Sequence, residues 1–257
     1  MHILLTNDDG VDAPGIRALL SEISKIATVT VVAPDRERSA TGHSITFFDP
    51  LRVWTIREDK DYSIYSSNGS PSDCVLLALD IIQGRPDFII AGINRGGNMG
   101  DDITYSGTVS AVMEGVIHGI PGFAISLNTF EHGNYIPAAK FAYGLTNQLI
   151  GKKFPHLAFS NVNVQHIPEE DIKGVAVTRQ GHSIYRERLE KRMDPRGRTY
   201  YWVGGEMPLG REEEGTDFKA VAEGKISITP LQLDLTHYRW MDEVKSWNLT
   251  NIDSKKQ

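Results

Sequence analysis

The sequence predicts an α/β protein built on a doubly wound, mainly parallel sheet. Through about residue 160, short apolar runs alternate with segments whose apolar residues recur at helical spacing. The apolar runs lack polar alternation, as expected for strands that helices cover on both faces. A chain of 257 residues with 40% hydrophobic and 23% charged residues is sufficient for one such domain.

The first 33 residues predict a strand, a helix and a second parallel strand. The apolar segment 1–5 is the first strand, and Pro14 suits the first turn of the helix that follows. The segment 29–33 is rich in β-branched residues and ends before Pro34, which predicts the second buried strand. The helix has its apolar residues at helical spacing, namely Ile16, Leu19, Leu20 and Ile23.

The middle of the chain continues this alternation. Ser70, Pro71 and Asp73 combine an N-cap, a first-turn proline and an acidic first turn, which predicts a deeply buried apolar helix. Further strands are expected at 88–93 and 123–127. Helices are expected behind residues 106–108 and over the segment with these apolar positions: Ala139, Ala142, Leu145 and Leu149.

The pattern changes after about residue 159. Short strand candidates between 173 and 201 flank a charged run at 186–192, which predicts an extended hairpin or arm, with a solvated loop as the alternative. A strand at 226–231 and a terminal helix at 237–247 follow. We therefore expect one domain over 1–257, with a core of about 1–160 plus 221–235, an arm of about 173–220 and a C-terminal helix and tail of about 236–257.

Composition excludes several classes of partner. The net charge of -6 disfavours nucleic-acid polymers and anionic membranes, and no apolar run reaches the ~20 residues of a membrane span. Cys74, the one cysteine, rules out an internal disulfide, and its apolar neighbours favour a buried thiol over a nucleophile. No secretory signal is recognised at the N-terminus, so we expect a cytoplasmic protein.

Polar loops follow three of the predicted strands, at 7–10, 35–43 and 94–108. In a parallel sheet these loops leave the same edge, where ligands bind. The adjacent carboxylates of Asp8 and Asp9 repel each other unless a cation lies between them, although Asp9 and Gly10 alternatively form only a turn. With Ser39 and Asn94 they offer an all-oxygen ligand set, which suits Mg²⁺, Mn²⁺ or Ca²⁺ and not a structural zinc.

The third loop has features of an anion site. Its glycines between 94 and 100 permit close backbone approach, and residues 106–108 open a helix whose free N–H groups suit a phosphate. The alternative is a flexible loop. Neither a Walker A pattern nor a Gly-x-Gly-x-x-Gly fingerprint occurs, and no Gly-x-Ser-x-Gly elbow supports a serine triad, so Ser106 is a cap or a phosphate contact.

Several separated motifs occur in one order along the chain. They are Asn-Asp-Asp-Gly at 7–10, Arg-Ser-Ala at 38–40, the segment 69–75, the segments 92–94 through 105–108, and Ser-Ile-Thr-Pro-Leu at 227–231. Together they closely resemble the motifs of the survival protein SurE family. The resemblance implies a Rossmann-like core and one divalent cation, Mg²⁺ or Mn²⁺, in each subunit. It also implies hydrolysis of nucleoside 5′- or 3′-monophosphates, and of short polyphosphate, with Asp8 and Asp9 as catalytic residues.

Matched position by position, the family's metal ligands fall on Asp8, Asp9, Ser39 and Asn94. Its phosphate contacts fall on Asn98, Ser106, Gly107 and Thr108. The resemblance further implies a homodimer or homotetramer whose C-terminal arm and helix are exchanged between subunits. The sequence departs from the family at Ser70, where threonine is usual. It also departs at residues 165–167, which stand between Val164 and Pro168, whereas the family usually has the proline directly after this valine.

Metal-assisted hydrolysis of a phosphomonoester is the function that these residues favour. The residues leave open whether Asp8 or Asp9 attacks phosphorus, transfers a proton or only binds the metal. Two alternatives remain, a nucleotide sensor without catalysis and a nucleotide-cofactor oxidoreductase. A haloacid-dehalogenase-type phosphatase requires Asp-x-Asp, whereas these carboxylates are adjacent.

Overall fold

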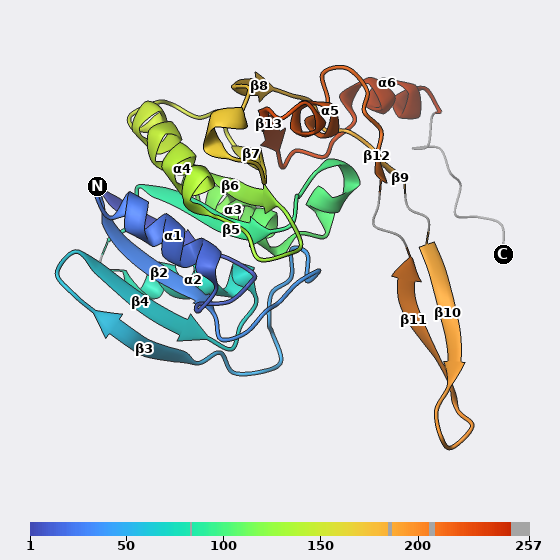
Figure 1. Cartoon of the computed structure of the whole chain (residues 1–257), viewed down its shortest axis with the longest axis horizontal. Coiled ribbons are helices and arrows are strands. Elements are labelled where there is room, and N and C mark those ends of the chain that lie inside the picture. The colour runs from blue at the N-terminus through green and yellow to red at the C-terminus, as the bar shows by residue number, and fades with distance from the viewer. Residues whose placement is uncertain (83, 185–186, 206–208, 248–257) are drawn as a thin grey trace, which may run out of the picture.

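The computed structural model describes residues 1–82, 84–184, 187–205 and 209–247, and a nine-stranded sheet forms its centre (Figure 1). β3 is antiparallel to β4 and β13 is antiparallel to β7, while the other neighbours are parallel. This arrangement confirms the mainly parallel sheet. In order across the sheet the strands are β3 (Val53–Glu58), β4 (Tyr62–Ser67), β2 (Thr28–Pro34), β1 (His2–Thr6), β5 (Phe88–Arg95), β6 (Gly122–Asn128), β7 (Ala158–Gln165), β13 (Ile226–Gln232) and β8 (Val175–Val177).

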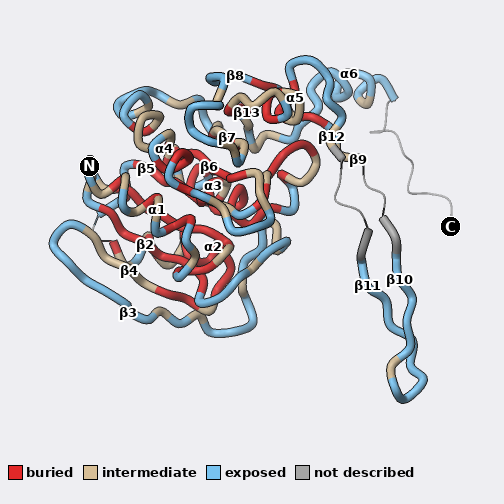
Figure 2. Tube along the Cα trace, viewed as in Figure 1, coloured by how far each residue is buried: buried red, intermediate tan, exposed pale blue. Residues whose placement is uncertain are grey.

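Helices cover both faces of the sheet. α1 (Pro14–Ile23) and α4 (Ile136–Leu149) pack together on one face, and α2 (Pro71–Ile81) and α3 (Gly107–Ile117) pack together on the other. Alternate residues of β1 enter the two cores, with Ile3 and Leu5 facing α1 and Leu4 facing α2. Figure 2 shows the buried residues concentrated in the sheet and the helix faces against it. The doubly wound fold is confirmed.

The order of the strands fixes where a ligand site can lie. The chain passes from β1 to β2 on one side, and β5 lies on the other side of β1, so the direction of winding reverses between β1 and β5. Such a switch point leaves a crevice beyond the carboxyl ends of the two strands. The loops after β1, β2 and β5 all leave the sheet at this edge, because these strands are parallel.

Some elements were not predicted from the sequence. β3 and β4 form an antiparallel hairpin at the sheet edge, and β3 is exposed along most of its length. An exposed edge strand carries little hydrophobic periodicity. β7, an eight-residue strand inside the sheet, was not predicted either. Other unpredicted elements are short: η1 (Gly100–Thr104), η2 (Glu169–Asp171) and α5 (Asp217–Ala222).

The C-terminal part contains the expected hairpin and helix. β10 (Glu187–Met193) and β11 (Thr199–Gly205) form an antiparallel hairpin that projects away from the sheet (Figure 1), beyond a short pair of β9 (Ser183–Ile184) and β12 (Leu209–Gly210). Within the range expected for the arm, β8 and α5 pack on the central sheet. The terminal helix is α6 (Tyr238–Ser246), whereas Arg186 of the charged run and the tail from 248 lie outside the described residues.

Among the described helices, none combines the length and the apolar character that crossing a membrane requires.

The start of α2 generates a stability prediction. The Ser70 hydroxyl accepts a hydrogen bond from the Asp73 amide (3.1 Å) and donates one to the Ser44 carbonyl (2.7 Å), and the Asp73 carboxylate accepts from the Ser70 amide (2.8 Å). Ser70→Ala removes this cap and is expected to lower the free energy of unfolding by about 1–2 kcal/mol in urea denaturation. Ser70→Thr keeps a capping hydroxyl and is the matched control; equal losses in both variants would contradict the capping role.

Candidate metal and phosphate site

A tight turn at the end of β1 presents the two adjacent carboxylates. The Asn7 side chain donates to the Gly10 carbonyl (2.8 Å) and accepts from the Gly10 amide (3.2 Å). Gly10 has φ +102°, and a side chain there would also press on the backbone of Arg36. Asp9 and Gly10 thus form the turn that was one interpretation of the sequence, and the same turn holds Asp8 and Asp9 at the sheet edge.

Asp8 is buried against the start of α3. Thr108 Oγ1 donates to the Asp8 carboxylate, which also accepts from the backbone amides of Gly107 and Thr108. A Cβ on Gly107 would lie 2.8 Å from the Asp8 Cβ, so only glycine permits this approach. Burial raises the pKa of Asp8 despite these donors. The helix start therefore compensates this carboxylate only in part.

Asp9 lies beside Asp8 with fewer donors. Its carboxylate accepts a hydrogen bond from the Arg95 amide (3.0 Å). Burial, and then the charge of Asp8, raise the pKa of Asp9 to about 6. Two under-compensated carboxylates at one strand end are a suitable environment for a divalent cation, because the cation supplies the missing positive charge.

Asn94 and Ser39 are the other two predicted metal ligands. Asn94 lies near the end of β5, and its side-chain nitrogen donates to the Gly96 carbonyl (2.8 Å), so the amide oxygen is the atom of this side chain that could bind a cation. Ser39 lies on the loop after β2, next to Arg38, whose amide donates to the Asp8 carbonyl (2.7 Å). The exposed Ser39 hydroxyl donates to Glu37 (2.6 Å).

The four predicted ligands therefore offer a cation two carboxylates and two neutral oxygens, one from an amide and one from a hydroxyl. Within the described part of the chain, no three His, Cys, Asp or Glu side chains group to hold a metal ion. Hard cations such as Mg²⁺ and Mn²⁺ accept a set of carboxylate, amide and hydroxyl oxygens. Asp8, Asp9 and Asn94 fit such an ion, and the loop with Ser39 is attached to them.

The predicted phosphate contacts lie on both sides of η1. Ser106 caps α3, since its hydroxyl accepts from the Val109 amide (3.1 Å), and Gly107 and Thr108 face Asp8. Asn98 is buried, and its side-chain nitrogen donates to Ser126 (2.9 Å) on β6. The structure therefore brings the start of α3 against Asp8, while Asn98 is fixed to the sheet.

The loop between Asn98 and Ser106 is attached to the base of the hairpin. The Asp217 carboxylate, at the start of α5, accepts from the amides of Gly100 (2.8 Å) and Gly181 (2.9 Å). The Gln180 side chain donates to the Gly100 carbonyl (2.9 Å). Segments from the last third of the chain thus position the loop that was predicted to contact phosphate.

Two further residues have structural roles. His43 binds one oxygen of the buried Glu114 (2.8 Å), and His118 binds the other (3.0 Å), so His43 fastens the Ser39 loop to α3. Cys74 is fully buried, which raises the pKa of its thiol, as expected for a packing residue.

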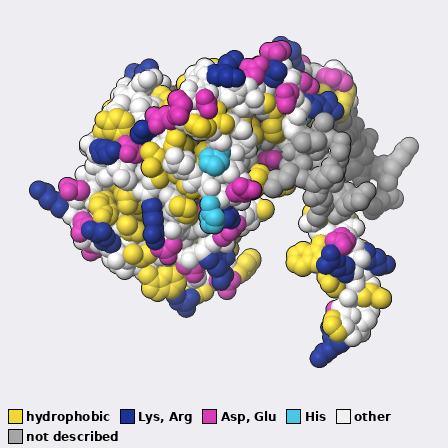
Figure 3. Space-filling view, in the orientation of Figure 1, with side chains coloured by type: hydrophobic (Ala, Val, Ile, Leu, Met, Phe, Trp, Pro, Cys, Tyr) yellow, Lys and Arg dark blue, Asp and Glu magenta, His cyan; other side chains and the backbone are white. Residues whose placement is uncertain are grey.

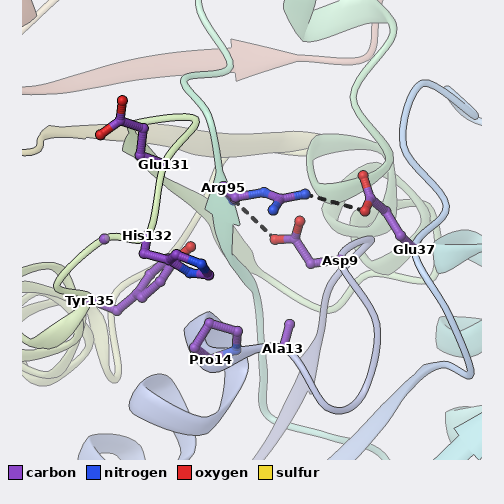
Figure 4. Close-up of a pocket in the computed structure, with 9 residues that line it drawn as sticks. Asp9, Ala13, Pro14, Glu37, Arg95, Glu131, His132 and Tyr135 are labelled. Carbon is purple, nitrogen blue, oxygen red and sulfur yellow. Dashed lines mark hydrogen bonds and ion pairs between the residues drawn. The ribbon is translucent and has the colours of Figure 1, made fainter.

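A pocket of about 320 Å³ opens beside Asp9 (Figure 4). Arg95 lies along it and approaches Glu37 (3.3 Å), and His132 and Tyr135 form part of its wall. None of Glu37, Arg95, His132 and Tyr135 was predicted to be a site residue. Glu37 and Arg95 lie within two of the loops expected to carry function, whereas His132 and Tyr135 lie on the loop after β6, which is parallel to β5 and releases this loop at the same edge. The predicted parallel arrangement of these two strands was therefore the signal that could have identified the loop after β6.

Comparisons with known proteins agree on one group. The model of the family described as "Survival protein SurE" matches residues 3–187 of this chain. A curated relative from Geobacter sulfurreducens, named 5′-nucleotidase SurE, is 50% identical over 252 residues, covering 97% of this chain and 95% of that protein. One of the same name from Geobacter metallireducens is 48% identical over 254 residues, covering 98% and 99%. A crystal structure of the Sure protein from Aquifex aeolicus has a TM-score of 0.83 at 42% identity, covering 96% of this chain and 100% of that one.

The raised pKa of Asp9 predicts a pH-dependent stability in the absence of divalent cations. The folded state keeps this proton up to a pH of about 6, whereas the unfolded chain loses it near 3.8, so stability falls as pH rises through this range. The free energy of unfolding is measured by urea denaturation with chelator. Between pH 4.5 and 7.5 it should fall by about 2 kcal/mol less in Asp9→Asn than in the wild type.

Asp12→Asn is the matched control, because Asp12 lies in the same loop with its side chain 84% exposed. It should follow the wild-type profile. A wild-type profile in Asp9→Asn as well would contradict the buried, under-compensated charge.

Proposed function

Because the chain belongs to the survival protein SurE family and is a 5′-nucleotidase-type hydrolase, we propose that it releases phosphate from nucleoside 5′-monophosphates with the aid of a divalent cation. The observation that carries the metal dependence is the buried pair of Asp8 and Asp9, whose pKa values are both raised. A cation at this position removes their mutual repulsion.

Asp8, Asp9 and Asn94, together with Ser39 from the attached loop, are the residues that would hold one Mg²⁺ or Mn²⁺ ion in each subunit. When bound, such an ion supplies positive charge that offsets the charge of the phosphate. Arg38 supports this arrangement through its backbone bond to Asp8.

The start of α3 would bind the phosphate next to Asp8. Helix N-termini favour anions because their first amides lack intrahelical partners, and here the Gly107 and Thr108 amides already face a carboxylate. The Ser106 hydroxyl, as the cap, and the fixed side chain of Asn98 complete the predicted contacts. These groups are held before substrate arrives, which is how enzymes stabilise charge in a transition state.

Hydrolysis of 3′-monophosphates and of short polyphosphate stays a prediction from the family resemblance, and so does a cytoplasmic location. The same phosphate-release assay tests the two substrates. It also separates an enzyme from a nucleotide sensor, because a sensor would bind the nucleotide without releasing phosphate.

Replacing either carboxylate should abolish the activity. With added Mn²⁺, Asp8→Asn and Asp9→Asn are each expected to lower kcat/KM for a nucleoside 5′-monophosphate at least about 100-fold, since each removes a charged ligand beside the phosphate. Phosphate release by the wild type should stop with chelator and return with Mn²⁺ or Mg²⁺. Asp12→Asn should retain wild-type rates, and wild-type rates in both site variants would refute the proposed site.

We also propose that the hairpin of β10 and β11 packs on another copy of this chain, in a dimer or tetramer with exchanged C-terminal elements. One face of the hairpin carries Leu189, Tyr201 and Val203, which are 67%, 58% and 79% exposed. Figure 3 shows apolar side chains exposed on the projecting arm. A two-stranded hairpin has little stability alone and gains it by covering an apolar face.

The same figure shows acidic and basic side chains intermixed on the face it presents, without a large basic area. With the net charge of -6, this supports the proposal that neither a nucleic-acid polymer nor a membrane is a partner.

Adding charge to the apolar face should separate the subunits. Leu189→Lys combined with Val203→Lys is expected to reduce the molar mass to that of one chain in size-exclusion chromatography with light scattering, because buried unpaired charges oppose association. Glu190→Lys places the same side chain on the opposite face of the hairpin and should leave the mass unchanged. A monomeric wild type, or an unchanged mass in the double variant, would contradict the proposal.

A further inference from the structure

Two buried asparagines interrupt the apolar face of β7. Phe159 on this face belongs to the core beneath α2 and α3, whereas Asn161 and Asn163, which follow it on the same face, are polar and fully buried. The backbone of β7 already pairs with β6 on one side and with β13 on the other. Burial of an amide side chain is unfavourable unless it forms hydrogen bonds, so these two side chains require partners outside the sheet ladder.

Both side chains bind the backbone of one loop residue, Asn98. The Asn163 side-chain oxygen accepts from the Asn98 amide (2.8 Å), and its nitrogen donates to the Asn98 carbonyl (3.0 Å). The Asn161 side-chain nitrogen donates to the same carbonyl (2.7 Å). Asn163 therefore bonds both backbone groups of Asn98, as a residue of a neighbouring strand would. The position of this part of the loop is thus set from β7, a strand that follows it by about 60 residues.

The side chain of Asn98 is oriented by the next strand. Its nitrogen donates to the Ser126 hydroxyl on β6 (2.9 Å). A side-chain amide nitrogen carries two hydrogens, and among the described residues only Ser126 accepts from this one. The second hydrogen is therefore available to an anion. Because β7 holds the backbone and β6 holds the side chain, this donor keeps one orientation before any ligand binds.

We propose that Asn163, assisted by Asn161, is a positioning residue for phosphate binding. It fixes the backbone of Asn98 so that the second hydrogen of the Asn98 side-chain amide meets the phosphate. The inference rests on the proposed function, in which Asn98 contacts phosphate. A merely structural attachment of the loop would stabilise the fold without changing the affinity of the folded protein for phosphate. A positioning residue changes that affinity, and it does so only through the side chain of Asn98.

Inorganic phosphate is the probe, because its binding requires no turnover. In isothermal titration calorimetry with Mg²⁺, Asn163→Ala should weaken phosphate binding about tenfold, since an aimed hydrogen bond to an anion is lost. Asn161→Ala removes one of the three bonds to Asn98 and should weaken binding about threefold, which keeps the test available if Asn163→Ala does not fold. The value of kcat/KM for adenosine 5′-monophosphate should fall by similar factors.

Ser227→Ala is the matched control. Ser227 lies opposite Asn163 on β13 and is equally buried, but its hydroxyl has no hydrogen-bond partner among the described residues. This variant changes the same part of the sheet without touching the loop. It should bind phosphate and hydrolyse the nucleotide as the wild type does.

A double-mutant cycle shows whether Asn163 acts through Asn98. Asn98→Ala alone should weaken phosphate binding at least about tenfold. In that background Asn163→Ala should change the affinity by less than about threefold, because the side chain that it positions is gone. An equal effect of Asn163→Ala with and without the Asn98 side chain would overturn the inference. Wild-type affinity in the folded Asn163→Ala and Asn161→Ala variants would overturn it as well.

Failure of this inference is distinct from failure of the proposed function. If the wild type bound phosphate but released none from any ester, while Asn163→Ala still weakened binding through Asn98, the positioning role would stand and the hydrolase proposal would fall. If the wild type hydrolysed the nucleotide and neither asparagine variant altered phosphate binding, the hydrolase proposal would stand and the positioning role would fall.

Discussion

The repulsion between two neighbouring buried carboxylates is the constraint around which this sheet edge is organised. Asp8 and Asp9 end β1 together, in a turn that Asn7 and Gly10 hold. The start of α3 approaches so closely that residue 107 must be glycine, and its donors stabilise only part of the charge. The remaining negative charge is the reason why a cation, and beside it a phosphate, suits this position.

Elements with strong local signals could be predicted from the sequence. The cap and proline before α2, and the β-branched run of β2, specify their structure within a few residues. β3 could not be predicted because most of its residues face solvent, where pairing with β4 and not an internal apolar pattern makes the strand. β8 and α5 are three and six residues long and take their stability from the sheet they pack on.

The candidate site was predictable to the extent that topology determines it. Parallel strands release their loops at one edge, so the proximity of Asp8 and Asn94 follows from the order of β1 and β5. The bond from Thr108 to Asp8 joins residues 100 positions apart and depends on how α3 is placed. His132 and Tyr135 belong to no motif, and only the parallel pairing of β5 and β6 brings the loop that carries them to the same sheet edge.

The bonds from Asp217 to Gly100 and Gly181 have a consequence for biosynthesis. A ribosome releases the N-terminal strands and the loop at 94–105 long before α5, and β13 enters the sheet later still. The loop therefore lacks its clamp until nearly the whole polypeptide has emerged. A nascent chain can bury much of its core during translation, yet the edge of the sheet that carries the candidate site is complete only at the end of synthesis.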